Sequence, residues 1–166
     1  MATIIRLPQT TDLAPLTELY NHYILNTTIT FDIAPYTINQ RREQWWCHYK
    51  HQGRHRLLVA EQDQVVVGYA TSSQFRTKAA YDTSVETSIY LSPQAQGKGL
   101  GTQLYQALFH SLANEDVHRA YAGITLPNPA SIALHHKFGF YSVGCYQEVG
   151  RKFEQYWDVE WFEKDL

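Results

Sequence analysis

Apolar residues recur at helical spacing in two segments of the chain, and each segment is typical of an amphipathic helix. The first helix is expected after Thr11 or Asp12, either of which would serve as N-cap, with an apolar face of Leu13, Leu16, Leu19 and Tyr20. The second carries Leu104, Leu108 and Leu112. Start and stop signals predict two further helices, one over 37–48 with Thr37 as cap and one over 131–138 that ends at Gly139.

Alternation of residue types predicts strands elsewhere. In segment 83–91 one face would carry Val85, Thr87, Ile89 and Leu91, and the other Glu86, Ser88 and Tyr90. Segments 56–61 and 65–70 flank a polar turn at 62–64 and predict a hairpin. Further strands are expected at 4–5, 119–126, 141–146 and 153–162, whereas 25–34 and 75–82 are expected to be loops.

The order of these elements combines hairpins with strand–helix–strand crossovers. It predicts an α/β (α+β) fold, a single domain over 1–166 in which helices flank both faces of a mixed, mostly antiparallel sheet. A length of 166 residues with 44% apolar residues agrees with one globular domain that buries a sizeable core.

Composition narrows the range of partners. The formal net charge is −2, so no net basic field would attract nucleic acid or an anionic membrane, and neither partner is expected. Cys47 and Cys145 form no CxxC pair and the chain has no long apolar run, which predicts a cytoplasmic protein with free thiols. Aromatic residues reach 14%; they would line a pocket, cover an oligomer interface or simply fill a tyrosine-rich core.

The most informative segment is the glycine-rich turn that follows the alternating strand. Glycines at 97, 99 and 101 let the backbone approach a ligand, and amides at a helix N-terminus favour an anion such as pyrophosphate. A P-loop is excluded because no Gly-Lys-Ser/Thr occurs, and a dinucleotide fingerprint fails because its third glycine is replaced by Thr102. A tight helix entry without a ligand is the structural alternative.

The turn Gln96-Gly-Lys-Gly99-Leu-Gly101 resembles the acetyl-coenzyme A pyrophosphate loop of the GNAT superfamily of N-acetyltransferases. Segments 85–91, 126–131, 134–140 and 149–159 resemble its phosphinothricin acetyltransferase-like branch of amino-acid N-acetyltransferases, so the likeness covers most of the chain. Residues 25–55 match this branch only loosely, and substrate choice is expected there.

The resemblance implies acetyl-CoA as co-substrate. Backbone groups of the strand would bind the acyl and pantetheine arm, the turn would hold the pyrophosphate, and Asn128 would bind the pantetheine amide unless it only forms a turn. Ser131 would touch the cofactor or, as capping predicts, begin the next helix. The implied cofactor-binding residues are Ile89, Tyr90, Leu91, Gln96, Gly97, Lys98, Gly99, Leu100, Gly101, Thr102, Asn128 and Ser131.

Two residues are candidates for proton transfer. An acceptor amine must lose a proton before it attacks, and the resemblance assigns this general-base role to Glu86, whose pKa would be raised among apolar strand residues. His135 matches a histidine of this branch that assists proton handling or contacts substrate, where many other GNAT members have a tyrosine. The alternatives are a surface glutamate on a half-exposed strand and a histidine packed at the helix–sheet interface.

The acceptor is expected to be a small amine such as phosphinothricin, methionine sulfone or sulfoximine, or a related L-amino acid. Arg76, Lys78 and Tyr81 would hold its anionic group, and Phe31 and Trp45 would wall its side chain. The alternative functions are acetylation of a protein or peptide N-terminus and a non-catalytic acyl-CoA sensor. A homodimer is also expected, for which the aromatic segment with Tyr156, Trp157, Trp161 and Phe162 would serve.

Cys47, His51 and His55 recur at helical spacing and superficially resemble a set of zinc ligands. Gly53 is expected to end the helix before His55, and no second Cys/His pair completes the set. No metal is therefore expected.

Overall fold

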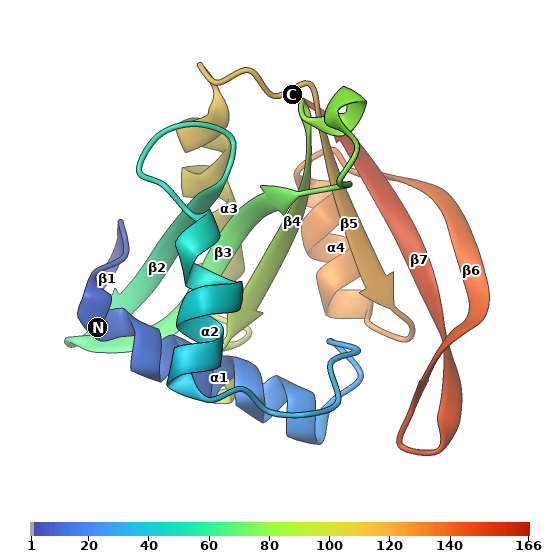
Figure 1. Cartoon of the computed structure of the whole chain (residues 1–166), viewed down its shortest axis with the longest axis horizontal. Coiled ribbons are helices and arrows are strands. Elements are labelled where there is room, and N and C mark those ends of the chain that lie inside the picture. The colour runs from blue at the N-terminus through green and yellow to red at the C-terminus, as the bar shows by residue number, and fades with distance from the viewer. Residues whose placement is uncertain (1) are drawn as a thin grey trace.

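A computed structural model describes residues 2–166. Its core is one seven-stranded sheet in the order β1-β2-β3-β4-β5-β7-β6 (Figure 1). The strands are β1 (Thr3–Arg6), β2 (Arg56–Gln62), β3 (Val65–Gln74), β4 (Ser84–Leu91), β5 (Arg119–Thr125), β6 (Tyr141–Lys152) and β7 (Gln155–Asp165). Only β4 and β5 pair in parallel, and every other neighbouring pair is antiparallel. The predicted mixed, mostly antiparallel sheet is confirmed.

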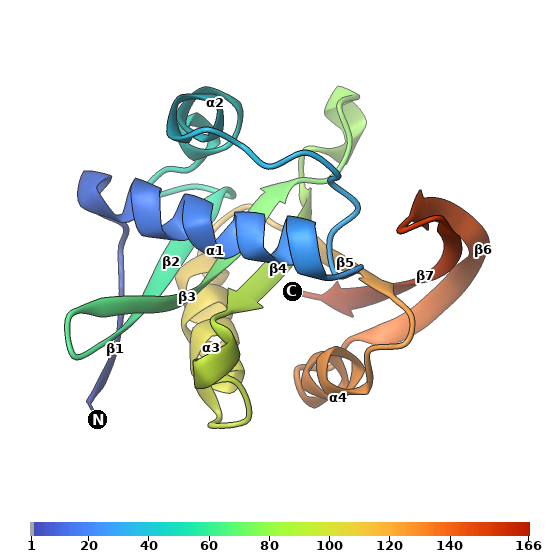
Figure 2. The same ribbon diagram turned by 90° about the horizontal axis from the view of Figure 1, so that it is seen from below.

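The helices form a layer on each face of the sheet. The first layer holds α1 (Leu13–Asn26) and α2 (Ile38–Gln44), and the opposite layer holds α3 (Leu100–Leu112) and α4 (Pro129–Lys137) (Figure 2). Leu16 packs with Leu57, Val59 and Tyr69 under the first layer. Leu104, Leu108 and Leu112 pack in the core of the second layer, as their spacing predicts. No helix in residues 2–166 combines the length and apolar character that a membrane span requires.

The separation of β4 from β5 determines where a ligand can reach the sheet. These strands pair only at Ser84, Val85 and Glu86, which lie opposite residues 119–121. Beyond Glu86 the strands diverge, as Figure 1 shows, while β4 remains paired to β3 as far as Leu91. One edge of the second half of β4 is therefore not covered by a neighbouring strand, as the resemblance requires.

Three local predictions about helix boundaries need correction. Helix α2 ends at Gln44, and a short 3-10 turn over Trp46–His48 follows it, although Thr37 does cap the helix by accepting a hydrogen bond from the Gln40 amide. Asp12 occupies the predicted position before α1, but its carboxylate accepts from Arg6 and the Gln9 amide and not from an amide of α1.

The third correction concerns the start of α4. The helix begins at Pro129, and Asn128 is its cap, with Oδ1 accepting a hydrogen bond from the Ser131 amide at 3.1 Å. The predicted cap at Ser131 is therefore wrong by one turn. Proline is favoured at the first helical position because it lacks an N–H that would otherwise be unpaired there.

Candidate active site

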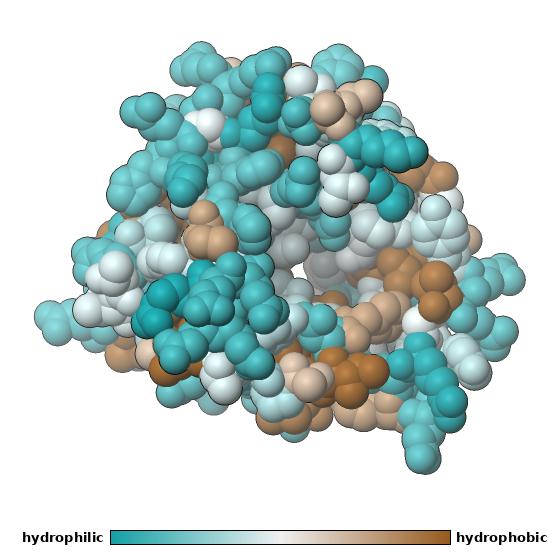
Figure 3. Space-filling view, in the orientation of Figure 1, coloured by the Kyte–Doolittle hydropathy of each residue, from teal (hydrophilic) through white to brown (hydrophobic). Residues whose placement is uncertain are grey.

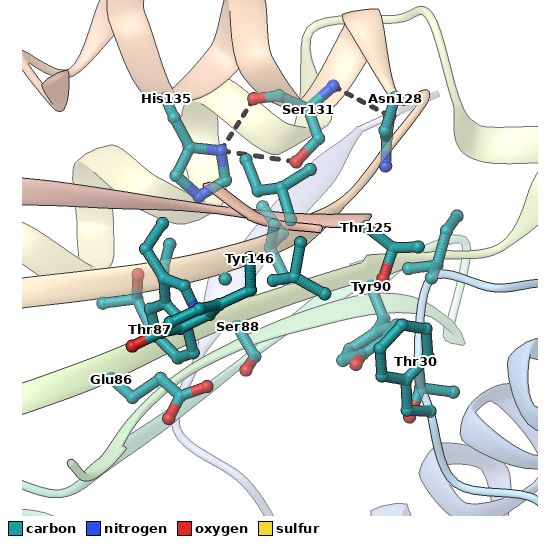
Figure 4. A pocket seen from close by; sticks show the side chains of 18 of the residues that line it. Thr30, Glu86, Thr87, Ser88, Tyr90, Thr125, Asn128, Ser131, His135 and Tyr146 are labelled. Carbon is teal, nitrogen blue, oxygen red and sulfur yellow. Dashed lines mark hydrogen bonds between the residues drawn. The ribbon is translucent and has the colours of Figure 1, made fainter. Parts of the chain in front are cut away.

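A hollow of about 670 Å³ lies where β4 and β5 separate. The space-filling view shows the molecule hollowed near its centre (Figure 3). In close-up, Glu86, Ser88 and Tyr90 of β4 lie along one side, opposite the α4 region (Figure 4). Eight of the residues singled out from sequence line this pocket: Phe31, Arg76, Glu86, Ile89, Tyr90, Asn128, Ser131 and His135.

Glu86 is the only carboxylate in the wall of this pocket among the described residues. Its residue lies on the β4 face opposite the fully buried Val85, as the alternation predicts. Burial raises the pKa of the Glu86 carboxyl above its ordinary value, and the positive charge of Arg76 opposes that rise. A carboxylate that is costly to ionise and faces a hollow is suited to accept a proton near neutral pH.

His135 is buried, with 3% of its surface exposed, and both of its ring nitrogens are engaged. Nδ1 lies 2.7 Å from the Ser131 carbonyl oxygen, which can only accept, so Nδ1 carries the proton (Figure 4). Nε2 therefore accepts from the Tyr105 hydroxyl at 2.9 Å. Burial lowers the pKa of His135, which favours this neutral form. His135 is therefore both packed against its neighbours and part of the pocket wall.

The glycine turn enters α3 through left-handed backbone conformations. Gly97 and Gly99 have φ of 72° and 77°, in the left-handed region that side chains disfavour, and a Cβ on either would meet no protein atom within 4 Å. The first backbone hydrogen bond of α3 is donated by the Gln103 amide to the Gly99 carbonyl oxygen. The amides of residues 100–102 thus have no helical acceptor, which is the arrangement that binds anions.

Two further contacts link this turn to the rest of the site. Lys137 of α4 places its Nζ 3.3 Å from the Thr102 hydroxyl, which adds a cation beside the first turn of α3. Gln96 donates to the Tyr23 hydroxyl, which in turn donates to the Leu91 carbonyl oxygen and so ties the turn to the end of β4. Sequence reasoning missed both Lys137 and Tyr23, because each lies far along the chain from the turn.

The residues expected to hold the acceptor separate into two groups. Phe31 lies in the pocket wall, where its ring packs so closely on Gly150 that a Cβ there would lie 2.1 Å from it. Arg76 is in the same wall and also borders an adjoining hollow. The structure places Lys78 and Tyr81 in that adjoining hollow and not in the main pocket. Trp45 lies in another hollow, on the α2 side of β4.

Several pocket residues come from the C-terminal hairpin, which sequence reasoning assigned to a dimer contact. Tyr146 and Trp161 line the pocket, and Phe162 is buried in the core at 1% exposure, so the dimer role predicted for Phe162 needs correction. A Cβ on Gly123 would lie 3.0 Å from the Trp161 ring, which packs over that glycine. The sequence did hold one signal for this contact: Gly123 lies inside strand β5, and a glycine within a strand often marks the close approach of another group.

No group of three or more His, Cys, Asp or Glu side chains in residues 2–166 is arranged to hold a metal ion. Cys47 and Cys145 are both exposed, unpaired thiols.

Comparison with known proteins agrees with this geometry. Residues 16–140 match the acetyltransferase (GNAT) family. Phosphinothricin N-acetyltransferase of Streptomyces coelicolor is 55% identical over 157 residues, which cover 93% of this chain and 91% of that protein. The L-methionine sulfoximine/L-methionine sulfone acetyltransferase of Salmonella typhimurium is 33% identical over 98% of this chain and 94% of that protein.

A solved structure extends the likeness to three dimensions. The crystal structure of a GNAT superfamily phosphinothricin acetyltransferase from Sinorhizobium meliloti, in complex with acetyl-CoA, superposes with a TM-score of 0.92 at 32% identity. The match covers 100% of this chain and 89% of that one. The chain therefore belongs to the acetyltransferase (GNAT) family of acyltransferases.

Proposed function

We propose that this chain is an acetyl-CoA-dependent N-acetyltransferase whose acceptor is the amino group of a small amino-acid-like compound. The observation that carries the proposal is the position of Glu86. Its half-buried carboxylate, with a raised pKa, faces the pocket at the point where β4 and β5 separate. The relatives named above act, by their names, on phosphinothricin and on methionine sulfoximine or sulfone, which supports this acceptor class.

The residues present fit acetyl-CoA. Outward-facing amides of the turn and of residues 100–102 would bind the pyrophosphate, with Lys98 and Lys137 as nearby cations. The uncovered edge of β4 at Ile89–Leu91 would bind the pantetheine arm in the manner of an added strand. Asn128 keeps its Oδ1 in the helix cap and turns its amide nitrogen toward the pocket, where it would donate to the same arm (Figure 4).

Acetyl-CoA supplies the acetyl group as a thioester, which the acceptor amine attacks to form a C–N bond as the C–S bond breaks. Glu86 would take the ammonium proton, directly or through a water, and so free the nitrogen lone pair. A backbone N–H of Tyr90 or Leu91 would donate to the carbonyl oxygen as negative charge develops on it. As the C–S bond breaks, the nitrogen would lose its second proton, and that proton would go to the departing thiolate to release CoA.

His135 would act through Tyr105 in this scheme. Because its Nε2 accepts from the Tyr105 hydroxyl, the pair holds that hydroxyl at the pocket wall. Burial raises the pKa of Tyr105, which keeps its hydroxyl protonated. Because that proton is donated to His135 Nε2, the hydroxyl oxygen would face the pocket as a hydrogen-bond acceptor. His135 would thereby orient a pocket hydroxyl without taking the acceptor proton itself.

Arg76 would hold the α-carboxylate of the acceptor, because its charge already acts on Glu86, where the adjacent amine must lie. Phe31 would form an apolar wall on the opposite side of that amine. Lys78 and Tyr81 lie in the hollow that adjoins Arg76, so they would guide an anionic acceptor toward the pocket.

We further propose that the protein is a cytoplasmic homodimer. Strand β6 is a sheet edge whose side chains are exposed for most of its length, including Tyr141, Val143 and Tyr146 at 46%, 49% and 56%. An exposed apolar edge strand invites pairing with another chain, and a second copy would cover it. The two exposed free thiols suit a reducing compartment.

The activity test is release of CoA thiol from acetyl-CoA with phosphinothricin, methionine sulfone and a short peptide as acceptors. We expect turnover with the amino-acid-like compounds, and a Glu86→Gln variant should lower kcat about 10²- to 10⁴-fold with acetyl-CoA affinity unchanged. Glu154→Gln, at an exposed turn, is the matched control.

Tight CoA binding without thiol release would indicate a sensor, and turnover of the peptide alone would indicate an N-terminal acetyltransferase. A normal rate in Glu86→Gln would exclude it as base.

A further inference from the structure

A second hollow of about 220 Å³ lies between α2 and the sheet and meets the main pocket at Glu86, Ser88 and Tyr90. Its floor is built from cross-strand pairs of polar side chains on β3 and β4. These pairs are Tyr69–Tyr90, Thr71–Ser88 and Ser73–Glu86. A row of hydroxyl groups therefore leads from the Glu86 carboxylate toward α2.

Arg41 of α2 lies at the far side of this hollow and is 5% exposed. Its guanidinium is sandwiched between two aromatic rings, with its central carbon 4.0 Å from the ring centre of Tyr20 and 3.7 Å from that of Trp45. One terminal nitrogen donates to the Tyr69 hydroxyl at 3.3 Å, and the buried Nε has no hydrogen-bond partner.

Arg41 has no ion-pair partner among the described residues, whereas Arg6, Arg54, Arg56 and Arg119 each pair with an acidic side chain. Burial of an unpaired cation is costly, and contact with ring faces offsets only part of that cost. Arg41 lines a polar hollow, and Tyr69 uses only one of the five N–H donors of its guanidinium, so an anion with two oxygens could pair with those that remain.

The position of the hollow indicates which end of an acceptor would reach Arg41. The α-carboxylate of an amino acid is attached to the same carbon as the amine, so it must stay beside Glu86, where Arg76 acts. Arg41 is separated from Glu86 by the hydroxyl-lined floor, and the aromatic walls around it suit the methylene groups of a side chain.

We propose that Arg41 is a specificity residue that binds a terminal oxyanion on the acceptor side chain. The preferred acceptor is then an α-amino acid with an acid at each end, such as one with a side-chain phosphinate. This inference rests on the proposed acetyltransferase function. It assigns the two arginines to different ends of one molecule, Arg76 to the α-carboxylate and Arg41 to the side-chain acid.

The test compares two acceptors in Arg41→Met. Phosphinothricin carries a side-chain phosphinate, whereas methionine sulfone carries an uncharged sulfonyl group. We expect the KM for phosphinothricin to rise about 10- to 100-fold relative to wild type, which corresponds to loss of a charged hydrogen-bonded pair. The KM for methionine sulfone should rise much less, and the KM for acetyl-CoA should not change. Arg42→Met, exposed on the same helix, is the matched control.

A folding readout separates this role from a structural one. If Arg41 serves a ligand, its replacement by Met removes an uncompensated buried charge, so the Tm should stay equal or rise. Arg41→Lys keeps the charge without the two-pronged geometry and should give a smaller rise in the phosphinothricin KM, which provides a test should Arg41→Met fail to fold.

The possible failures are distinguishable. A lower Tm with equal losses for both acceptors would assign Arg41 to the fold alone and overturn the inference. An unchanged ratio of the two KM values would do the same while leaving the acetyltransferase function intact. A wild-type protein that acetylates neither compound would overturn the proposed function and, with it, this assignment.

Discussion

At the scale of single residues, the proposed general-base role of Glu86 depends on how burial and charge set the pKa of its carboxyl. Burial raises the pKa of its carboxyl, and the Arg76 guanidinium partly opposes that rise. A general base works only when ionised, so activity must fall as the pH drops through this raised pKa. The fall should therefore occur at a higher pH than an ordinary glutamate would give.

Arg76→Met should shift the fall in activity at low pH, the acid limb of the pH profile, to a still higher pH. Without the cation the carboxylate is harder to ionise, so the pKa of Glu86 rises and kcat at saturating acceptor should decline at a higher pH than in the wild type. The measurement is kcat against pH for both proteins, with Arg42→Met as control. An acid limb that stays in place would mean that another group limits the rate at low pH.

At the scale of elements, the turn before α3 combines two properties that a regular helix start would not supply. Gly97 and Gly99 hold positive φ values, and the amides that follow them have no helical acceptor. The protein leaves space over these glycines, because a Cβ on either would meet none of its own atoms within 4 Å. The open space lies where a phosphate would approach the backbone.

Gly99→Val should weaken acetyl-CoA binding by at least an order of magnitude. The branched side chain disfavours φ near 77° by about 1–2 kcal/mol and would stand over the amides proposed to bind the pyrophosphate. Gly139→Val is a matched control, since Gly139 also has a positive φ of 82° but follows α4. We expect both variants to lose stability and only Gly99→Val to lose cofactor affinity in a calorimetric titration. Equal affinities in the two variants would show that the pyrophosphate binds elsewhere.

At the scale of the whole molecule, the C-terminal hairpin of β6 and β7 both lines the pocket and forms one edge of the sheet. It supplies Tyr146 and Trp161 to the pocket wall and leaves β6 as an exposed edge. Tyr146 belongs to both surfaces, being exposed and pocket-lining. A second copy that covers β6 would therefore also cover part of the pocket wall.

Val143→Lys should convert the proposed homodimer to a monomer. A lysine at this exposed position would place a charge near the start of the edge strand, which opposes pairing with another chain. Light scattering coupled to size exclusion should give the dimer mass for the wild type and the monomer mass, near 19.2 kDa, for the variant. A monomeric wild type would contradict the proposed dimer.

Features carried by neighbouring residues were predictable from the sequence. The order of strands and helices, the two faces of β4 and the special turn at 96–101 follow from alternation, helical spacing and glycine content, which act over a few residues. For the same reason Glu86 was placed on the correct face. Where Asp12 and Ser131 were expected as caps, the sequence offered other polar residues nearby: the Asp12 carboxylate accepts from Arg6 and Gln9, and Asn128 caps α4 in place of Ser131.

Tertiary structure alone decided how distant segments complete the pocket. The sequence determined that β4 carries a carboxylate and leads to a glycine turn, but not that β4 leaves β5 at Glu86 or that Trp161 covers Gly123. Nor did local pattern distinguish Arg76, in the pocket, from Lys78, in the hollow beside it. Burial and the pairing of charges depend on residues that folding brings together. The cage around Arg41, built from α1, α2 and β3, therefore exists only in the folded chain.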